Sequence, residues 1–129
     1  MDLLIDTHVL IWFITDDIKL PPKTRQIIEN IENDCFVSIA TYWEIAIKHS
    51  LGRLDLNSGL ENIFQIIEET GFETLPITVN QILNNARLEF HHKNPFDRII
   101  IAQAISENLS LITKDEQFKE YKVSLIWEK

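Results

Sequence analysis

Four acidic side chains of this sequence lie beside apolar segments instead of in polar runs. Asp6 follows the apolar run Leu3–Ile5, and Asp115 follows the run LSLIT. Glu44 lies inside the segment YWEIAIK, and Asp97 comes directly before IIIAQA. Carboxylates that converge in a protein interior repel one another strongly unless a cation neutralises their charge. Acids in these positions therefore indicate metal-dependent chemistry.

The types of the candidate ligands predict the metal. Hard oxygen ligands, without histidine or cysteine at ligand spacing, favour Mg²⁺ or Mn²⁺ over zinc. One or two such ions would activate a water and stabilise the leaving oxygen of a phosphodiester. We therefore expect a metal-dependent hydrolase whose metal-binding and catalytic residues are Asp6, Glu44, Asp97 and Asp115.

Each acid also has an ordinary local explanation. Glu44 could pair with Lys48 one helical turn later on a surface. Asn94, Pro95 and Asp97 fit a helix cap, a proline at the first helical position and the acid of a capping box. Asp6 and Asp115 also fit turn or cap positions. The combination of all four on buried elements is what favours a site.

Apolar runs alternate with helical patterns along the chain. We expect buried strands at 3–5, 35–39, 72–77 and 109–113, an edge strand within 123–127, and helices at 8–14, from 21 onwards, 41–50, 60–70, 79–88 and 95–107. Continuous apolar strands between helices predict an α/β fold: a three-layer α/β/α sandwich with a mostly parallel central sheet. Because ligands bind beyond the carboxyl ends of such strands, Asp6 and Asp115 should face the same edge.

Length and composition favour one folded domain spanning residues 1–129. The chain is 45% hydrophobic and 25% charged, and its apolar runs are too short to cross a membrane. Its start lacks the basic region of a secretory signal, and the single cysteine, Cys35, lies in an apolar stretch. These features predict a cytoplasmic protein with a buried core thiol. The net charge of −8 argues against a broad basic nucleic-acid-binding face, but it does not exclude a nuclease.

Four segments together resemble a known family. LLIDTHVLIW, SIATYWEIAIKHSLGRL, HHKNPFDRIIIAQA and LITKDEQF, in that order, resemble the PIN-domain nucleases, and closely the VapC-type toxins of type II toxin-antitoxin pairs. The likeness covers nearly the whole chain. It implies a PIN-like fold, Mg²⁺- or Mn²⁺-dependent ribonuclease activity, a cognate antitoxin as partner and a homodimer.

The resemblance also implies roles for individual residues. The family's four acids fall, in order, on Asp6, Glu44, Asp97 and Asp115. Thr113 matches the hydroxyl residue of the family's T-x-D pattern, which would support the site, and Thr7 fits a similar supporting role.

One position departs from the family pattern. Many close relatives read D-P-F-D-R where this chain has Asn94 followed by Pro-Phe-Asp-Arg. Asparagine caps a helix about as well as aspartate, so we expect Asn94 to be structural and Asp97 to be the site acid. If the aspartate that these relatives have at position 94 helps to bind a second metal ion, this chain would bind that ion more weakly.

Substrate and partner surfaces are less marked in the sequence. Candidate cations for drawing RNA to the site are Lys48, His49, Arg53, His91, His92, Lys93 and Arg98, although the histidines are expected to be ordinary surface residues. Trp12 and Phe13 could line a dimer surface, with core packing as the alternative.

Two other functions remain compatible with these residues. A phosphatase with an aspartyl nucleophile would need a second acid two residues after Asp6, where this chain has His8. A non-catalytic PIN-like binding module would lack carboxylate-dependent Mn²⁺ binding, and RNA cleavage with and without EDTA would separate it from a nuclease.

Overall fold

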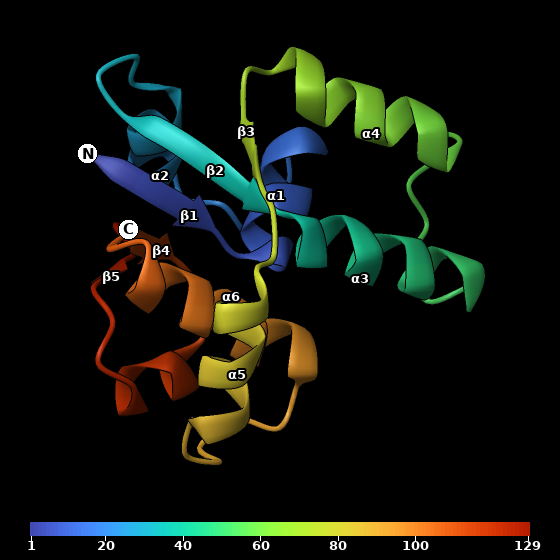
Figure 1. Ribbon diagram of the computed structural model, residues 1–129. Coiled ribbons are helices and arrows are strands. Elements are labelled where there is room, and N and C mark those ends of the chain that lie inside the picture. Colours follow the sequence, from blue (N-terminus) through green and yellow to red (C-terminus); the bar gives the residue numbers. More distant parts are fainter.

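Five short strands form the centre of the computed structural model, which describes residues 1–129 (Figure 1). They are β1 (Asp2–Ile5), β2 (Asp34–Ser38), β3 (Glu73–Leu75), β4 (Ser110–Ile112) and β5 (Leu125–Ile126). The strand order is β3-β2-β1-β4-β5, and all four pairings are parallel. The expected α/β fold with a parallel sheet is confirmed, including the edge strand near the C-terminus.

Helices connect the strands on both faces of the sheet. They are α1 (Thr7–Ile14), α2 (Pro22–Glu29), α3 (Ile39–Ser50), α4 (Leu60–Glu69), α5 (Val79–Arg87), α6 (Pro95–Ser106) and a 3₁₀ helix (Glu116–Glu120). In Figure 1, α4 lies on the opposite side of the sheet from α5 and α6. No helix has the length and apolar character needed to span a membrane.

The expected start of α3 at Thr41 was wrong by two residues. The helix begins at Ile39 because Ser38 is its N-cap, with Oγ accepting a hydrogen bond of 3.0 Å from the Ala40 N–H. β2 consequently ends at Ser38 instead of Ile39. A helix thus begins directly at the carboxyl end of β2, with no intervening loop.

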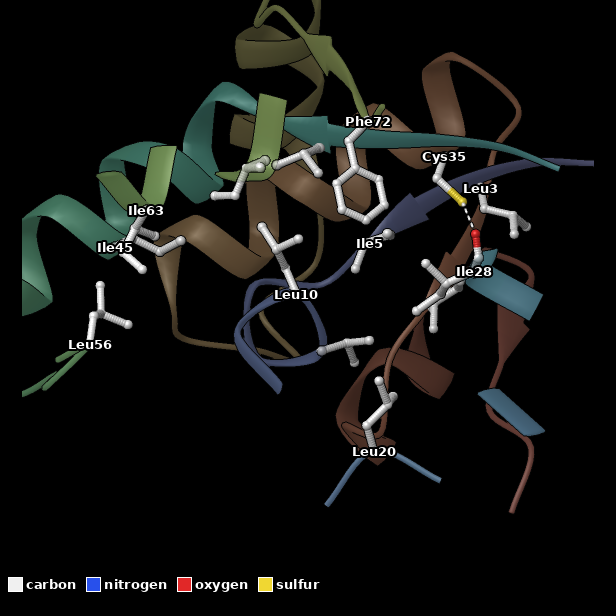
Figure 2. Packing of buried hydrophobic residues seen from close by; sticks show 14 residues of the cluster. Leu3, Ile5, Leu10, Leu20, Ile28, Cys35, Ile45, Leu56, Ile63 and Phe72 are labelled. Atoms are coloured by element: carbon white, nitrogen blue, oxygen red, sulfur yellow. Dashed lines mark hydrogen bonds between the residues drawn. The ribbon is translucent and has the colours of Figure 1, made fainter. Parts of the chain in front are cut away.

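Two apolar clusters, one on each face, explain why the strands read as continuous apolar runs. Leu3 and Ile5 of β1 belong to the cluster shown in Figure 2, whereas Leu4 belongs to the cluster on the other face. All three side chains are fully buried. Because both faces are covered, the sheet is the middle layer of the expected three-layer sandwich.

Cys35 lies in the first cluster, as expected for a core thiol. Its Sγ donates a hydrogen bond of 3.7 Å to the carbonyl oxygen of Ile28 (Figure 2). Burial, helped by the charge of Asp34, raises the pKa of this thiol to about 11. A thiol with so high a pKa is a poor nucleophile at neutral pH, which agrees with a structural role.

Candidate metal centre

Asp6 lies at the carboxyl end of β1 and is the N-cap of α1. Its Oδ1 accepts a long hydrogen bond of 3.4 Å from the His8 N–H, and its Oδ2 accepts one of 2.7 Å from the Thr113 hydroxyl. The side chain is almost completely buried. Burial raises the pKa of Asp6 above its ordinary value, the charge of Glu44 adds to this, and the hydrogen bond from Thr113 opposes it.

Glu44 lies on α3 and is fully buried, so the sequence-based alternative of a surface ion pair was wrong about its exposure. Lys48 Nζ does lie 2.8 Å from Glu44 Oε2, one helical turn away. This ion pair lacks hydrogen-bond geometry, and both carboxylate oxygens are buried without a hydrogen-bond donor. Unsatisfied buried charges are costly, so Glu44 lacks part of the stabilisation that a buried carboxylate needs.

Asp97 lies in the first turn of α6, but it does not cap the helix. Asn94 is the N-cap, and its Oδ1 accepts hydrogen bonds from the Phe96 N–H (2.9 Å) and the Asp97 N–H (3.4 Å). The reciprocal bond of a capping box is absent, because the Asn94 N–H donates to His92 Nδ1 instead. As expected, Asn94 caps the helix. The Asp97 side chain is therefore free to make other contacts.

The electrostatics of Asp97 show that the four acids converge. Burial, together with the charges of Asp6, Glu44 and Asp115, raises its pKa to about 8, whereas Lys48 opposes the shift. These acids come from segments separated by up to 109 positions in the sequence. The fold has thus brought the other three predicted site acids within electrostatic reach of Asp97.

Asp115 follows β4 and is the N-cap of the 3₁₀ helix, where its Oδ1 accepts a hydrogen bond of 2.9 Å from the Gln117 N–H. Its own N–H donates to the Thr113 hydroxyl at 3.0 Å. Thr113 therefore contacts both Asp6 and Asp115. Thr7, by contrast, contacts no acid: its hydroxyl is hydrogen-bonded to that of Thr41 at 2.9 Å and so joins α1 to α3.

His92 is a component of the site that the sequence analysis missed. Its Nε2 donates a hydrogen bond of 2.8 Å to Asp115 Oδ2 and lies 3.1 Å from Asp97 Oδ2. The expectation of a surface histidine was wrong, because the loop before α6 folds inward and leaves this side chain 8% exposed. The pair His91-His92, one residue before the N-P-F-D segment, was the available signal, but a loop has no periodicity that would show which ring points inward.

Arg98 is also placed differently from the expectation that it could draw RNA to the site. It is buried, and its guanidinium donates hydrogen bonds to the carbonyl oxygens of Asn85, Leu88 and Glu89 at 2.9 to 3.0 Å. It also donates to the Tyr121 hydroxyl at 3.3 Å. Its Nη1 and Nη2 groups hold the end of α5 and the following loop, so Arg98 is structural. Arg53, His91 and Lys93 are exposed and remain candidates for contacting RNA.

Comparison with protein families gives a clear match. The PIN domain model matches residues 3–123, and thus includes all four acids. The chain belongs to the PIN-domain family. The PIN fold is typical of nucleases, and PIN domains generally bind divalent metal ions through acidic residues.

Several solved structures with a similar fold belong to toxin-antitoxin systems. One is VapBC2 from Rickettsia felis bound to a DNA fragment from its promoter, with a TM-score of 0.77, 16% identity, and coverage of 99% of this chain and 100% of that one. Another is DNA-bound VapBC from Salmonella typhimurium, with a TM-score of 0.69, 17% identity, and coverage of 98% and 97%. VapBC-5 from Mycobacterium tuberculosis has a TM-score of 0.58, 22% identity, and coverage of 97% and 95%. No curated protein matches the chain significantly.

The residues of this PIN domain fit a hard divalent cation. The four converging side chains offer only carboxylate oxygens, the donors that Mg²⁺ and Mn²⁺ prefer. On Glu44, Oε1 is buried without a partner, and Oε2 meets only Lys48 Nζ at 2.8 Å, without hydrogen-bond geometry. Asp97, Asp115 and His92 also place ligand-type atoms within 4.8 Å of one another. Asp6, Glu44, Asp97 and Asp115 would therefore be the residues that hold the ion.

Proposed function

We propose that this protein is a Mg²⁺- or Mn²⁺-dependent endoribonuclease that acts in the cytoplasm as the toxin of a toxin-antitoxin pair. The observation that carries the proposal is the fully buried carboxylate of Glu44, which lies in a cluster with three further acids and meets a single cation, Lys48 Nζ at 2.8 Å, without accepting a hydrogen bond of good geometry. The one charge of Lys48 cannot balance four acids, so the cluster is unfavourable unless a further cation joins it. In a PIN domain this cluster is best explained as a metal centre for phosphodiester hydrolysis.

In this proposal each acid both binds the ion and serves catalysis. When bound, the ion would supply Lewis-acid activation of a water and stabilise the leaving oxygen of the RNA. Thr113 would keep Asp6 and Asp115 oriented through its two hydrogen bonds. Because the chain has a net charge of −8, RNA would be drawn by local cations, with the exposed Arg53, His91 and Lys93 as the candidates.

Cleavage of RNA with and without EDTA tests this function. We expect cleavage in Mg²⁺ or Mn²⁺, none in EDTA, and recovery when the metal is restored. Asp6→Asn should abolish cleavage and keep the fold. Asp16→Asn is the matched control, because Asp16 is exposed and pairs with Arg25 away from the site. Cleavage in EDTA, or full activity of Asp6→Asn, would exclude the proposed mechanism, and carboxylate-dependent Mn²⁺ binding without RNA cleavage would favour a binding module.

The partners in this proposal are a cognate antitoxin and a second copy of the chain. Chains of similar fold occur in toxin-antitoxin complexes, which supports the antitoxin. Co-expression with the neighbouring open reading frame, followed by a pull-down of the chain, tests it. An antitoxin from that frame should be retained on the chain through washing.

The homodimer is supported by an exposed apolar surface on α3 and α5. Trp43 of α3 and Ile82 of α5 line one apolar hollow there, and they are 61% and 53% exposed. Trp12 and Phe13 do not belong to it, since their rings pack against Trp127 and Phe72. Light scattering of the wild type should therefore give the mass of a dimer, and Trp43→Arg should shift it toward a monomer.

A further inference from the structure

His92 is held in its position by contacts that do not involve the acids. Its backbone N–H donates a hydrogen bond of 3.0 Å to the Tyr121 hydroxyl, which in turn donates one of 2.7 Å to the carbonyl oxygen of Glu89. Its ring packs edge-on against Phe118, with 5.3 Å between the ring centroids. The imidazole is thus fixed by the surrounding loop and the 3₁₀ helix before any ion arrives.

The hydrogen bonds of the ring determine which nitrogen carries the proton. Nδ1 accepts a hydrogen bond of 3.2 Å from the Asn94 N–H, so Nδ1 has no proton of its own. A neutral imidazole with an acceptor at Nδ1 carries its proton on Nε2. Nε2 is therefore a donor directed at the acids, and it offers no lone pair to a cation.

The two acids that His92 meets come from different elements. Asp97 lies in the first turn of α6, and Asp115 is the N-cap of the 3₁₀ helix. Both present Oδ2 to the same Nε2, at 3.1 and 2.8 Å. The Nε2–H group is thus the contact that joins these two carboxyl groups, and they would lose it if that donor were removed.

We propose that His92 is a positioning residue that holds Asp97 and Asp115 together in the arrangement a divalent cation requires. The inference rests on the proposed metal centre. It assigns His92 the task of orienting two metal-binding carboxylates from Nε2, through its hydrogen bond to Asp115 and its close contact with Asp97, without itself binding the ion.

The test is Mn²⁺ affinity, measured by calorimetry on the full metal-free chain. His92→Phe keeps the ring volume but removes the donor, and we expect it to weaken Mn²⁺ binding by roughly 10- to 100-fold. His92→Gln can place an amide N–H near the position of Nε2, so its affinity should stay close to that of the wild type. His92→Asn carries a donor too short to reach the acids and should resemble His92→Phe, which keeps the test valid if the phenylalanine variant does not fold.

His91→Phe is the matched control. His91 is the exposed neighbour whose ring packs against Tyr121 and whose Nε2 lies 2.8 Å from Glu89 Oε2, away from the site acids. This variant should bind Mn²⁺ like the wild type. Equal weakening in His91→Phe and His92→Phe would mean that the loop is merely perturbed, and would overturn the proposal.

Pulsed electron paramagnetic resonance of the Mn²⁺-loaded wild type provides a second readout. We expect no signal from directly coordinated histidine nitrogen, and such a signal would overturn the proposal by making His92 a ligand. If the wild type binds Mn²⁺, Asp6→Asn does not, and His92→Phe binds normally, the inference fails while the proposed metal centre stands. A wild type that binds no Mn²⁺ overturns both.

Discussion

The Thr113 hydroxyl donates a hydrogen bond of 2.7 Å to Oδ2 of Asp6, a residue 107 positions away in the sequence. The same hydroxyl accepts the N–H of Asp115 at 3.0 Å. Thr113 follows β4, which pairs directly with β1, so the two strand ends deliver these groups to one place. A single hydroxyl therefore fixes the relative positions of the first and the fourth acid.

Replacing Thr113 with valine should weaken Mn²⁺ binding by roughly 10- to 100-fold, because the shape is kept while Asp6 loses its orienting donor. The free energy of unfolding should fall by about 1–3 kcal/mol, since Asp6 Oδ2 and the Asp115 N–H lose their partner in a buried place. Calorimetry and urea unfolding measure the two effects. Thr113→Ser keeps the hydroxyl and should resemble the wild type, whereas wild-type metal affinity in Thr113→Val would remove Thr113 from the site.

The stability of the metal-free protein should fall as the pH rises from about 4 to 8. Asp97 has a pKa of about 8 in the folded protein, against an ordinary value of 3.8, so the folded state keeps a proton that the unfolded chain has lost. The raised pKa of Asp6 acts in the same direction. This contribution is fully present below the unfolded pKa and is lost as the pH approaches 8, which should cost on the order of a few kcal/mol. Urea unfolding in EDTA at pH 5 and pH 8 measures it, and equal stability at both would contradict the repulsion described for the cluster.

Asp97→Asn should strongly reduce RNA cleavage but should hardly lower the free energy of unfolding. The amide is a poor ligand for a hard cation, so RNA cleavage should fall by more than the roughly 10- to 100-fold that loss of a supporting residue costs. Because the variant removes one of four converging charges, the metal-free protein should be as stable as the wild type at pH 8 or more stable. Cleavage rates and urea unfolding of the same preparation check both parts. A large loss of stability with activity retained would make Asp97 a structural residue and remove it from the proposed metal site.

Arg98→Lys should destabilise the fold by about 2–4 kcal/mol, because one ammonium cannot replace the planar set of donors that several buried carbonyls require. The carbonyl oxygens of Asn85 and Leu88 would lose their partner, and the loop that carries His92 would loosen. Chemical unfolding measures the loss. Arg53→Lys, at an exposed position, should change stability little, and an equally small effect of Arg98→Lys would show that the loop is held by other contacts.

The parallel sheet and the positions of two site acids, Asp6 and Asp115, could be predicted from the sequence. Continuous apolar runs predicted buried parallel strands, and the rule for the carboxyl edge of such sheets placed Asp6 and Asp115 together. Asn94 and Pro95 predicted the start of α6 through local capping chemistry, which depends on neighbouring residues only. These features need no knowledge of distant contacts.

Other parts of the candidate site depend on contacts across the fold and were missed. His92 turns inward because Tyr121, 29 positions later, accepts its backbone N–H. Arg98 resembles a surface cation in the sequence, and only the path of the preceding loop surrounds it with carbonyl oxygens. Glu44 and Lys48 have the spacing of a common surface pair, and the packing of α3 against the sheet is what buries the glutamate.

Asn94→Asp should leave both the fold and Mn²⁺ affinity close to wild type. The Oδ1 of Asn94 is already used by the N–H groups of Phe96 and Asp97, and an aspartate oxygen would accept the same two bonds. Asn94→Ala should instead lose about 1 kcal/mol of stability, because it removes the cap without adding charge. Urea unfolding and Mn²⁺ calorimetry of the three proteins separate capping from metal binding. If Asn94→Asp bound Mn²⁺ clearly more tightly, the relatives' aspartate at this position would be a metal ligand, and the asparagine of this chain would mark a weakened second ion site.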